Sequence, residues 1–433
     1  MSLIKIEDLF HFEKGVLQSS KCIEGEYDFI TAASEWKTNN EYTHNCEALV
    51  FAAAASGSLG RTHYVNGKFI SSDLCFIITP KDPKNYPIDL KFYHIIFNEL
   101  KNDIVKNTKA GTSKEAIGMK SFGNYCLPYF EINQQIEIKQ QFEKMLSINK
   151  GIDNELSDQL SLIKQLRQVF LREAMQGLLV KTETNGETGA ELLEKIKVEK
   201  AQLIKEKKLK KEKELPPISE EEIPFEIPEH WTWCRLGEIC STITKGSSPN
   251  WQGVQYVDED KGILFITSKN VDSFKVDLTK ATYVEEKFNE IEPRSILKKG
   301  DLLTNIVGAS IGRTALFDLD VLANINQAVC ILRIEHNFID KKFMLYLMNS
   351  DLALKMMFES QFAPGRANLS MSNIANFTIP MPSLIEQQQI VDKLDELMAF
   401  CDSLEERIKE SQGLNEKLLQ EVLREALQGE ETI

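Results

Sequence analysis

A seven-residue stretch occurs twice in this chain, as Leu171-Arg172-Glu173-Ala174-Met175-Gln176-Gly177 and as Leu423-Arg424-Glu425-Ala426-Leu427-Gln428-Gly429, 252 positions apart. The same offset relates Ser58-Leu59-Gly60-Arg61-Thr62 to Ser310-Ile311-Gly312-Arg313-Thr314. It also relates single residues between these stretches, which include Gln135 and Gln387, Ile138 and Ile390, and Leu162 and Leu414. An offset held over about 120 residues indicates an internal duplication, and two like units can be related by a pseudo-two-fold axis.

Size and composition are those of an ordinary globular protein. The 433 residues, 42% hydrophobic and 27% charged, suffice for roughly two to four domains with their own cores. No apolar run approaches the roughly 20 residues that cross a bilayer, and the acidic first residues Glu7 and Asp8 argue against a signal peptide. The eight cysteines are scattered without a Cys-x-x-Cys pair, which predicts reduced thiols in the cytoplasm and neither a disulfide framework nor a zinc site.

The net charge of −14 is concentrated near the C-terminus. Residues 1–130 carry 14 basic and 15 acidic side chains, residues 231–383 carry 16 and 17, and residues 384–433 carry 5 and 13. Contacts between phosphates and Lys or Arg supply most of the non-specific affinity for DNA. Nearly neutral halves can hold a basic face, but we expect them to bind DNA weakly alone and to need partner proteins.

Each repeat consists of a predicted α/β half followed by a long helix. Runs rich in β-branched and aromatic residues, punctuated by Gly, Asn and Pro, predict strands that include 29–31, 74–78, 264–267 and 328–332. The apolar segments 91–98 and 342–349 predict buried helices. We therefore divide the chain into domain 1 (1–130), helix 1 (131–177), a linker (178–222), domain 2 (223–383) and helix 2 (384–433).

The two long helices are the firmest structural prediction. Apolar residues recur at alternating steps of four and three, which indicates a coiled-coil seam. The seam residues are Ile138, Phe142, Met145, Ile152, Leu156, Ile163, Leu166 and Phe170 in the first helix, and Ile390, Leu394, Leu397, Cys401, Leu404, Ile408, Leu418 and Val422 in the second. Pro128 and Pro380 lie upstream, and Gly177 and Gly429 lie where a helix end is expected. Neither seam can stay exposed, so we expect the helices to pair antiparallel, with one α/β head at each end.

A charged segment separates the repeats. Residues 191–214 have helix-forming composition, and 216–222 begin with two prolines that end the helix. We expect the lysines of this segment to form a solvated helix face and not a DNA-binding patch.

The sequence contains no motif for a catalytic centre of its own. There is no Gly-x-x-x-x-Gly-Lys-[Ser/Thr], no Gly-x-Ser-x-Gly and no His-Glu-x-x-His. The Gly57–Arg61 segment lacks the downstream acid that would complete a nucleotide fingerprint, and the Asn/Asp-Pro-Pro-Tyr/Phe run of adenine methylases is missing. These absences predict a protein that is not an enzyme.

Several polar and basic loop residues are candidates for nucleic-acid contact. Small residues allow close approach to a phosphate or a groove, and Arg can bind guanine or phosphate with two hydrogen bonds. The alternative, a tight turn whose Arg binds a local carboxylate, is equally compatible with the repeated segments Gly57–Arg61 and Gly308–Arg313. The flexible segments 109–114 and 363–370 form a second matched pair, for which ordinary loop composition is the alternative. The candidates are Ser58, Arg61, Lys109, Lys114, Lys245, Ser248, Lys269, Asn270, Ser310, Arg313, Arg366 and Asn368.

Two segments carry a resemblance to a known family. The segment from Pro224 to Glu238, with Ile227-Pro228-Glu229-His230-Trp231-Thr232-Trp233, resembles the opening of a target-recognition domain in type I restriction-modification specificity subunits. The segment Ile379-Pro380-Met381-Pro382-Ser383-Leu384-Ile385-Glu386-Gln387-Gln388-Gln389-Ile390 is similar to the family's proline-led entry to a conserved helix, which ends in Glu-Gln-x-x-Ile. The first repeat departs from this pattern, with Phe130 and Gln134 in place of Pro382 and Glu386 and no Ile-Pro-x-x-Trp-x-Trp opening.

The resemblance implies an α+β fold in which two pseudo-symmetric α/β target-recognition domains are joined by two long antiparallel coiled-coil helices. Each domain would read one half of a bipartite double-stranded DNA sequence, and the helices would set the spacing. The helices would dock two modification subunits, which hold S-adenosylmethionine, and motor-nuclease restriction subunits would join them; this chain would bind no cofactor and no metal. The expected partner-binding residues on the helices are Gln135, Arg172, Glu173, Gln387, Arg424 and Glu425.

An alternative from another class is a coiled-coil scaffold whose heads bind protein. Such a scaffold would show no salt-dependent affinity for DNA even with partners present. A hidden methyltransferase or nuclease is a third possibility, which binding of S-adenosylmethionine to the purified chain would reveal.

Overall fold

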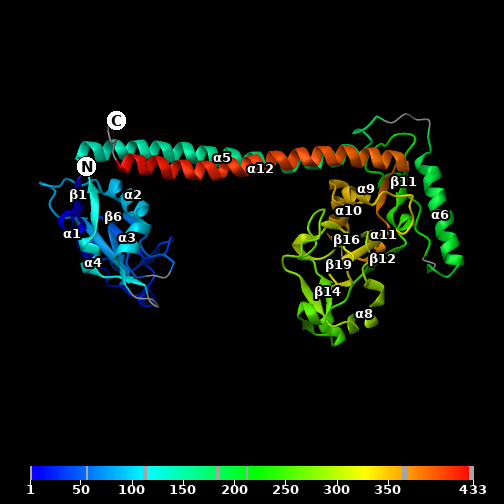
Figure 1. Cartoon of the computed structure of the whole chain (residues 1–433), viewed down its shortest axis with the longest axis horizontal. Helices are drawn as coiled ribbons and strands as arrows, with labels where there is room; N and C mark the ends of the chain where they lie inside the picture. Colours follow the sequence, from blue (N-terminus) through cyan, green and yellow to red (C-terminus); the bar gives the residue numbers. More distant parts are fainter. Residues whose placement is uncertain are drawn as a thin grey trace. The chain divides into compact units, whose positions relative to one another are not determined.

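The computed structural model describes residues 2–54, 57–110, 115–181, 186–210, 213–362 and 369–428. The chain forms two compact units: unit 1 comprises residues 1–157 and 409–433, and unit 2 comprises residues 158–408. Two helices of 44 and 45 residues, α5 (Ile132–Met175) and α12 (Leu384–Gln428), contribute to both units (Figure 1).

Unit 1 is built on a six-stranded sheet with the order β2-β7-β5-β6-β3-β4. Its strands are β2 (Phe10–Lys14), β3 (Tyr27–Ile30), β4 (Lys37–Asn39), β5 (His44–Ala52), β6 (Thr62–Ser71) and β7 (Cys75–Pro80). The helices are α1 (Ile6–Leu9), α2 (Leu90–Glu99), α3 (Lys101–Thr108) and α4 (Met119–Asn124), and β8 (Lys109–Ala110) pairs with β9 (Ala116–Ile117). The first strand, β1 (Ser2–Lys5), pairs with β10 (Cys126–Tyr129), which leads into α5.

Unit 2 divides its strands between two four-stranded sheets, β12-β19-β16-β17 and β13-β15-β14-β18. The strands are β12 (Thr242–Lys245), β13 (Tyr256–Val257), β14 (Ile263–Ile266), β15 (Thr282–Val284), β16 (Asp301–Asn305), β17 (Thr314–Phe317), β18 (Ala323–Ile325) and β19 (Val329–Arg333). The helices are α6 (Gly189–Lys205), α7 (Leu236–Ile239), α8 (Lys287–Ile291), α9 (Lys341–Met348), α10 (Asp351–Phe362) and α11 (Met371–Ala375). A separate pair, β11 (Thr232–Arg235) and β20 (Thr378–Met381), leads into α12.

The internal repeat of the sequence is visible in matching elements. The strand orders β2-β7-β5-β6 and β12-β19-β16-β17 correspond, as do α2 and α9. Asn98 of α2 donates to the carbonyl of Thr62 (3.0 Å), and Asn349 after α9 donates to the carbonyl of Thr314 (2.9 Å). The predicted strands and the two predicted buried helices are thus confirmed.

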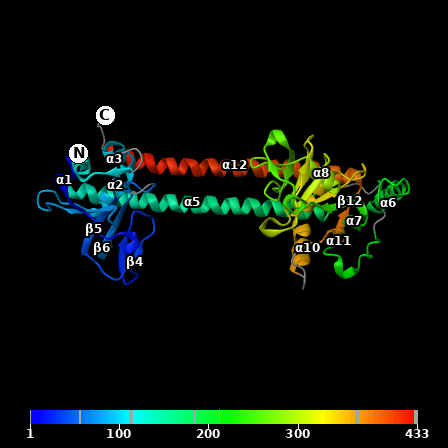
Figure 2. The same ribbon diagram turned by 90° about the horizontal axis from the view of Figure 1, so that it is seen from below.

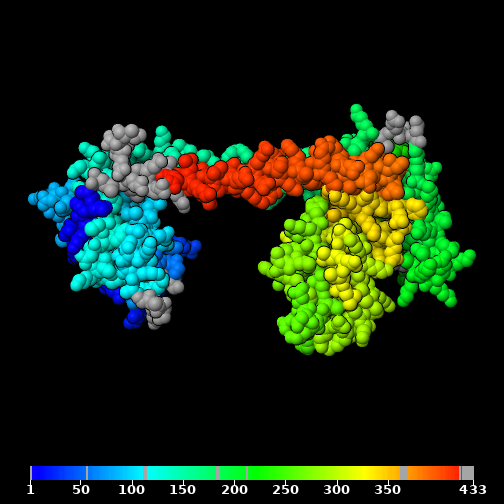
Figure 3. All heavy atoms as spheres, viewed as in Figure 1, coloured from blue at the N-terminus to red at the C-terminus, as the bar shows by residue number. Residues whose placement is uncertain are grey.

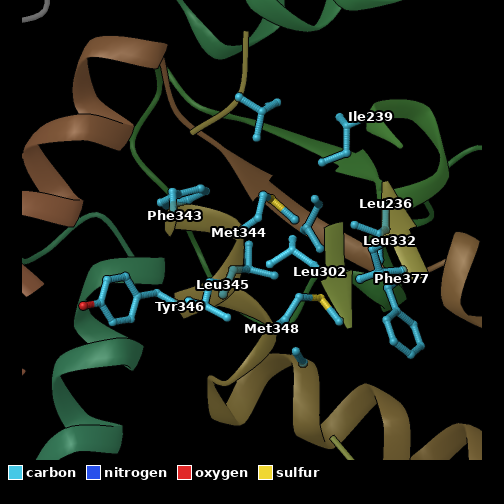
Figure 4. Close-up of a cluster of buried hydrophobic side chains, with 14 of the residues drawn as sticks. Leu236, Ile239, Leu302, Leu332, Phe343, Met344, Leu345, Tyr346, Met348 and Phe377 are labelled. Atoms are coloured by element: carbon cyan, nitrogen blue, oxygen red, sulfur yellow. The ribbon is translucent and has the colours of Figure 1, made fainter. Parts of the chain in front are cut away.

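Central strands divide their side chains between two cores because successive residues of a strand point to opposite faces. In β5, Leu49 and Phe51 enter one core of unit 1, whereas Ala48, Val50 and Ala52 enter the other. In unit 2 the largest described core packs α9 against strands and short helices, and Figure 4 shows Met344, Leu345 and Met348 around Leu302, with Leu332 beside Leu236 and Phe377. Burying a Leu or Phe side chain stabilises the fold by about 1.5–3 kcal/mol. The apolar residues of the central strands therefore determine where each sheet lies.

The two long helices pair antiparallel within each unit. In unit 1, the side-chain amide of Asn149 donates to the carbonyl of Asn415 (3.0 Å), and that of Asn415 donates to Asp153 (2.8 Å). In unit 2, the Arg167 guanidinium binds Asp402 (2.7 Å) and Glu405 (3.0 Å). Residue numbers therefore fall along α12 as they rise along α5, and both helices can be followed in Figure 2.

Part of the predicted seam is exposed. Ile163, Ile390, Leu394 and Cys401 are buried, but Ile152 is 40% and Leu418 52% exposed. The prediction that both seams are fully covered was therefore wrong, because two helices alone cover only a narrow stripe on each other.

The first copy of the repeated Leu-Arg-Glu-Ala segment ends α5 inside a core, whereas Gly429, predicted to end the second helix, lies outside the described residues. Leu171, Ala174 and Met175 are buried in the main core of unit 2. Gly177 follows with a positive φ of 72°, and the amide of Leu178 reaches back to the carbonyl of Glu173 (2.9 Å). This is a Schellman ending, which favours glycine because an L side chain is strained there.

The linker packs on unit 2. Thr188 and Glu191 form a capping box at the start of α6, which covers the core with Leu192, Leu193 and Ile196. The chain leaves α6 at Glu206, so the helix predicted to continue to residue 214 was wrong beyond Lys205. The Arg235 guanidinium, which is buried, then binds the carbonyls of Pro216 (3.1 Å) and Pro217 (3.0 Å) and the carboxylate of Glu222 (2.8 Å). Figure 3 shows α6 against the side of this unit.

Candidate nucleic-acid interface

In unit 1, two loops lie together at one end of the sheet. The first, residues 31–36, follows β3, and the second, described at residues 53–54 and 57–61, joins β5 to β6. The guanidinium of Arg61 donates to the carbonyl of Ala32 (3.1 Å) and to Ser58 Oγ (3.3 Å). The loop after β3 also contains an internal turn in which the amide of Ala33 donates to Thr31 Oγ1 (3.2 Å).

Unit 2 repeats this arrangement with other side chains. Thr267 Oγ1 accepts from the amide of Lys269 (3.3 Å), which matches the Thr31 turn of unit 1. Asn305 Nδ2 donates to the carbonyls of Ser268 (3.0 Å) and Val271 (3.1 Å), and thereby joins the loop after β14 to the end of β16. Arg313 is about half exposed and approaches Asp272 (3.5 Å).

The repeated Ser-x-Gly-Arg segments form the same tight turn in both units, with the amides of Arg61 and Arg313 donating to the carbonyls of Ser58 (3.0 Å) and Ser310 (3.3 Å). The preceding glycine lies three residues before Gly60 in unit 1 and four residues before Gly312 in unit 2. Gly57 and Gly60 have φ of 78° and 82°, and Gly308 and Gly312 have 77° and 90°. The positive φ at these positions favours glycine, because an L side chain is strained there. Arg61 binds a carbonyl and a hydroxyl and Arg313 lies near a carboxylate, so the local-turn interpretation describes both structures.

Most of the predicted DNA-contact residues that the structure describes reach the surface. Lys245, Lys269 and Arg313 are exposed; Lys109 is exposed and paired with Glu115 (2.7 Å). Partly exposed are Ser58, Arg61, Ser248 and Ser310. Lys114, Arg366 and Asn368 lie outside the described residues.

The prediction for Asn270 was wrong. Its side chain is buried and holds its own loop, with Oδ1 accepting from the amide of Thr267 (3.0 Å) and Nδ2 donating to the carbonyl of Asp277 (3.0 Å). A buried amide with both groups satisfied stabilises the loop and cannot reach a base edge.

Two of the helix residues predicted to bind partners are also buried. Gln135 and Gln387 bond to the backbone of their own unit, so they serve folding and not docking. Arg172 is exposed and Glu173 partly exposed, whereas the described side chains do not include those of Arg424 and Glu425.

Sequence reasoning missed residues whose repeat offset is not 252. Lys14-Gly15 and Lys245-Gly246 both end a strand, and a Cβ on either glycine would clash with a backbone carbonyl, that of Ser72 (2.1 Å) or Ile325 (1.9 Å). Lys14 is therefore the unit 1 counterpart of Lys245. Likewise, Phe29-Ile30-Thr31 matches Phe265-Ile266-Thr267, an equivalence that could have been found by allowing a shorter offset.

A cavity of about 610 Å³ opens beside the unit 1 loops. Its lining includes Trp36, His63, Tyr64 and His94, and the indole Nε1 of Trp36 donates to His63 Nδ1 (3.2 Å). Burial lowers the pKa of both His63 and His94, so both rings are neutral near pH 7.

Within the described parts of the chain, no group of three or more His, Cys, Asp or Glu could hold a metal ion. No helix among these residues is long and apolar enough to cross a membrane.

Comparison with known proteins gives the family. The model of the type I restriction modification DNA specificity domain matches residues 1–158 and 228–411. The chain belongs to this family. Each matched segment of the DNA specificity family contains one pair of the loops described above, and the unmatched residues between them contain the end of α5, α6 and the Arg235-bound linker.

Several specificity subunits are similar in sequence. The type I restriction enzyme EcoEI specificity subunit of Escherichia coli is 27% identical over 64% of this chain, and the EcoBI specificity subunit of the same organism is 25% identical over 79%. The alignments cover 45% and 65% of those proteins, so the chain spans less than two thirds of their length.

Solved structures confirm the fold. The HsdS subunit of Thermoanaerobacter tengcongensis is 16% identical, with a TM-score of 0.53 over 99% of this chain and 96% of that one. A chain from a study of complex assembly and conformational transition of the type I R-M system reaches 0.56 at 16% identity, over 98% of this chain and 97% of that one. The predicted α+β class, with two α/β domains and two long antiparallel helices, is thereby confirmed.

The Trp36–His63 contact predicts acid sensitivity of unit 1. The folded pKa of His63 lies below its value in the unfolded chain, near 6.5, so its contribution to stability is complete above that pH and is lost as the pH falls below it. Protonated Nδ1 can no longer accept from Trp36. Urea midpoints measured from pH 7.5 to 5 should fall less steeply in His63→Asn, whose Oδ1 can replace Nδ1 as acceptor. Equal slopes for the variant and the wild type would refute this.

Proposed function

We propose that this chain is the DNA sequence-specificity subunit of a type I restriction-modification complex. In this proposal each unit reads one half of a bipartite double-stranded DNA target. The paired helices set the spacing and dock two modification subunits, with motor-nuclease restriction subunits joining the complex. The function is recognition and not catalysis, it takes place in the cytoplasm, and S-adenosylmethionine binds to the modification subunits.

One observation carries the proposal: the DNA specificity family matches the chain twice, and each match holds the same two-loop surface. The side chains on these surfaces differ, and the exposed Ala33 in the loop after β3 stands where the loop after β14 has the exposed Lys269. Base edges are distinguished by their pattern of donors and acceptors. Two different surfaces on one scaffold therefore suit two different half-sites.

A domain exchange tests the proposal. Replacing residues 1–128 by the corresponding segment of a relative with another specificity should change only one half of the methylated sequence, because unit 2 keeps its own loops. The readout is methylation sequencing of DNA from cells that also express the modification subunits. A reciprocal chimaera that exchanges residues 186–383 should change the other half. A change of both halves by either chimaera would count against the proposal.

The two repeated arginines should behave differently on substitution. Arg313→Ala should weaken DNA binding of the assembled complex by about 1–3 kcal/mol if Arg313 reads a base, and should leave stability nearly unchanged because its exposed ion pair contributes about 0–1 kcal/mol. Arg61→Ala should also destabilise unit 1, because the carbonyl of Ala32 and Ser58 Oγ lose their donor.

The DNA affinity of the variants is measured by fluorescence anisotropy with cognate and scrambled duplexes at several salt concentrations. Arg294→Ala, a substitution at an exposed position, is the control. Equal loss on all sequences, with a reduced salt slope, would assign Arg313 to a phosphate.

The helices offer a matched pair of docking positions. Ile148 and Phe400 are related by the 252-residue offset, and so are Leu162 and Leu414. All four are large apolar residues exposed to solvent, at 48%, 54%, 59% and 65% respectively. We infer from their recurrence at equivalent positions that these residues belong to protein-binding sites, and their duplication fits two copies of one partner.

Substitutions at these positions test the stoichiometry. Ile148→Asp and Phe400→Asp should each remove one modification subunit, and the double variant should remove both, with affinity reduced about 30-fold or more as expected for loss of a central apolar contact. Native mass spectrometry counts the bound subunits. Asn154→Asp, exposed on α5, is the control. If the double variant still bound two modification subunits, the docking surface would have to lie elsewhere.

A further inference from the structure

The cavity in unit 1 has a counterpart in unit 2, and there the place is occupied. The repeat aligns α2 with α9 and β6 with β17, so that Ile95 corresponds to Tyr346 and His63 to Ala315. In unit 2, Phe274 packs against Tyr346 with the ring centroids 5.7 Å apart and forms a parallel β-bridge with Ala315. The two residues that Phe274 contacts therefore correspond to two residues that line the unit 1 cavity.

The backbone of Phe274 indicates that this position is important in unit 2. Its φ is +73°, which is uncommon for a bulky residue and is held here by surrounding contacts. Its amide donates to the carbonyl of Thr314 (2.8 Å), which also accepts from Asn349 (2.9 Å). The loop after β14 thus delivers an aromatic ring into the space beside β17 and α9.

Unit 1 satisfies the equivalent carbonyl in another way. The carbonyl of Thr62 accepts from Asn98 (3.0 Å), and its second donor is His94 Nε2 (3.0 Å), a side chain of α2. His94 takes the place of the Phe274 amide as the second donor. The loop after β3 places Trp36 in the wall of the cavity, with the ring centroids of Trp36 and His63 5.9 Å apart, and about 610 Å³ remains unfilled.

The walls of the cavity suit an aromatic ring. Trp36, Tyr64, His63 and His94 provide ring faces and edges, and Phe142 and Leu146 of α5 contribute apolar surface. Its volume of about 610 Å³ is within the range typical of sites for small organic groups. Aromatic rings held edge-to-face or stacked gain about 0.5–1.5 kcal/mol beyond the burial of their area.

The charge of the cavity lining favours a protein occupant over a nucleic acid. The carboxylates of Glu99 and Glu143 line the cavity, and Lys91, which lies over the Tyr64 ring at 5.4 Å, is its one lysine or arginine. Both histidines are neutral near pH 7. A nucleobase would bring phosphates toward this net negative site, whereas an aromatic side chain of a protein brings no such charge.

We propose that the unit 1 cavity receives an aromatic side chain from the modification subunit that docks on this half of the molecule, as the corresponding place in unit 2 receives Phe274. The identity of that partner rests on the proposed function, whereas the affinity of the cavity for an aromatic ring does not. Unit 1 therefore has an aromatic docking socket that unit 2 fills from its own chain.

A small probe tests the cavity in the full chain without any partner. 4-Fluorophenol, a tyrosine-like ring, is followed by ¹⁹F NMR. The wild type should bind one equivalent, Ile95→Trp should bind none because the new ring fills the cavity, and Phe274→Ala should bind two. Ser34→Trp, which fills the cavity from another wall, replaces Ile95→Trp if that variant fails to fold. Binding that persists in the filled variants, or a Phe274→Ala variant without an additional site, would overturn the proposal.

A second measurement tests the occupant. Ile95→Trp should weaken binding of one of the two modification subunits at least tenfold, whereas Asn102→Trp, an exposed position on α3, should leave both unchanged. Unchanged binding of both subunits to Ile95→Trp would reject the modification subunit as occupant. A selective loss of DNA affinity would reject it in favour of a nucleobase. If the wild-type chain bound no modification subunit, the proposed function and this partner would both fail, and the 4-fluorophenol result would stand by itself.

Discussion

A buried glutamine at the start of each long helix fixes the α/β head to that helix. Gln135 donates to the carbonyls of Phe130 (2.7 Å) and Pro87 (2.9 Å) and accepts from the amide of Asp89 (2.8 Å). Gln387 donates to the carbonyl of Pro382 (3.1 Å) and accepts from the amide of Asp340 (2.9 Å). Each of these aspartates caps the N-terminus of α2 or α9 with its side chain. One amide therefore ties the strand that enters the long helix to the helix that carries the core. Leaving a buried donor or acceptor unpaired costs about 1–3 kcal/mol. Each glutamine is therefore stably buried only when its bond to the residue before the long helix and its bond to the residue that caps α2 or α9 are both formed.

The fixed framework leaves the loops free to differ. The Ser-x-Gly-Arg turn has the same backbone hydrogen bond in both units, yet the neighbouring loop is held by Arg61 in unit 1 and by Asn305 in unit 2. The strand before that loop also differs in its pairing: β3 joins the main sheet through β6, whereas β14 joins a separate sheet with β18. Duplication has preserved what determines the fold, and divergence is concentrated where side chains reach solvent. This division suits a protein whose two halves recognise different partners with one architecture.

The sequence predicted the framework well because periodic burial determines it. The strands, the helices α2 and α9 and the ending of α5 follow from apolar spacing, proline and glycine. The buried state of Asn270 could not be predicted, since a polar residue in a basic loop has the same composition whether it faces solvent or a backbone carbonyl. The equivalence of Lys14 with Lys245 was hidden because insertions change the repeat offset near the start of each head. The early end of α6 depends on Lys207, whose φ of 61° stops the helix in a run of good helix formers.

The clamp around Arg235 has an evolutionary consequence. Its guanidinium binds residues 216, 217 and 222, which precede the second matched segment of the DNA specificity family. Recombination that imported a new second head with a crossover at residue 228 would join an Arg235 from one parent to a Glu222 from another. Crossovers that yield a working hybrid should instead lie upstream of α6, so that α6, the linker bound by Arg235 and the second α/β head are inherited together.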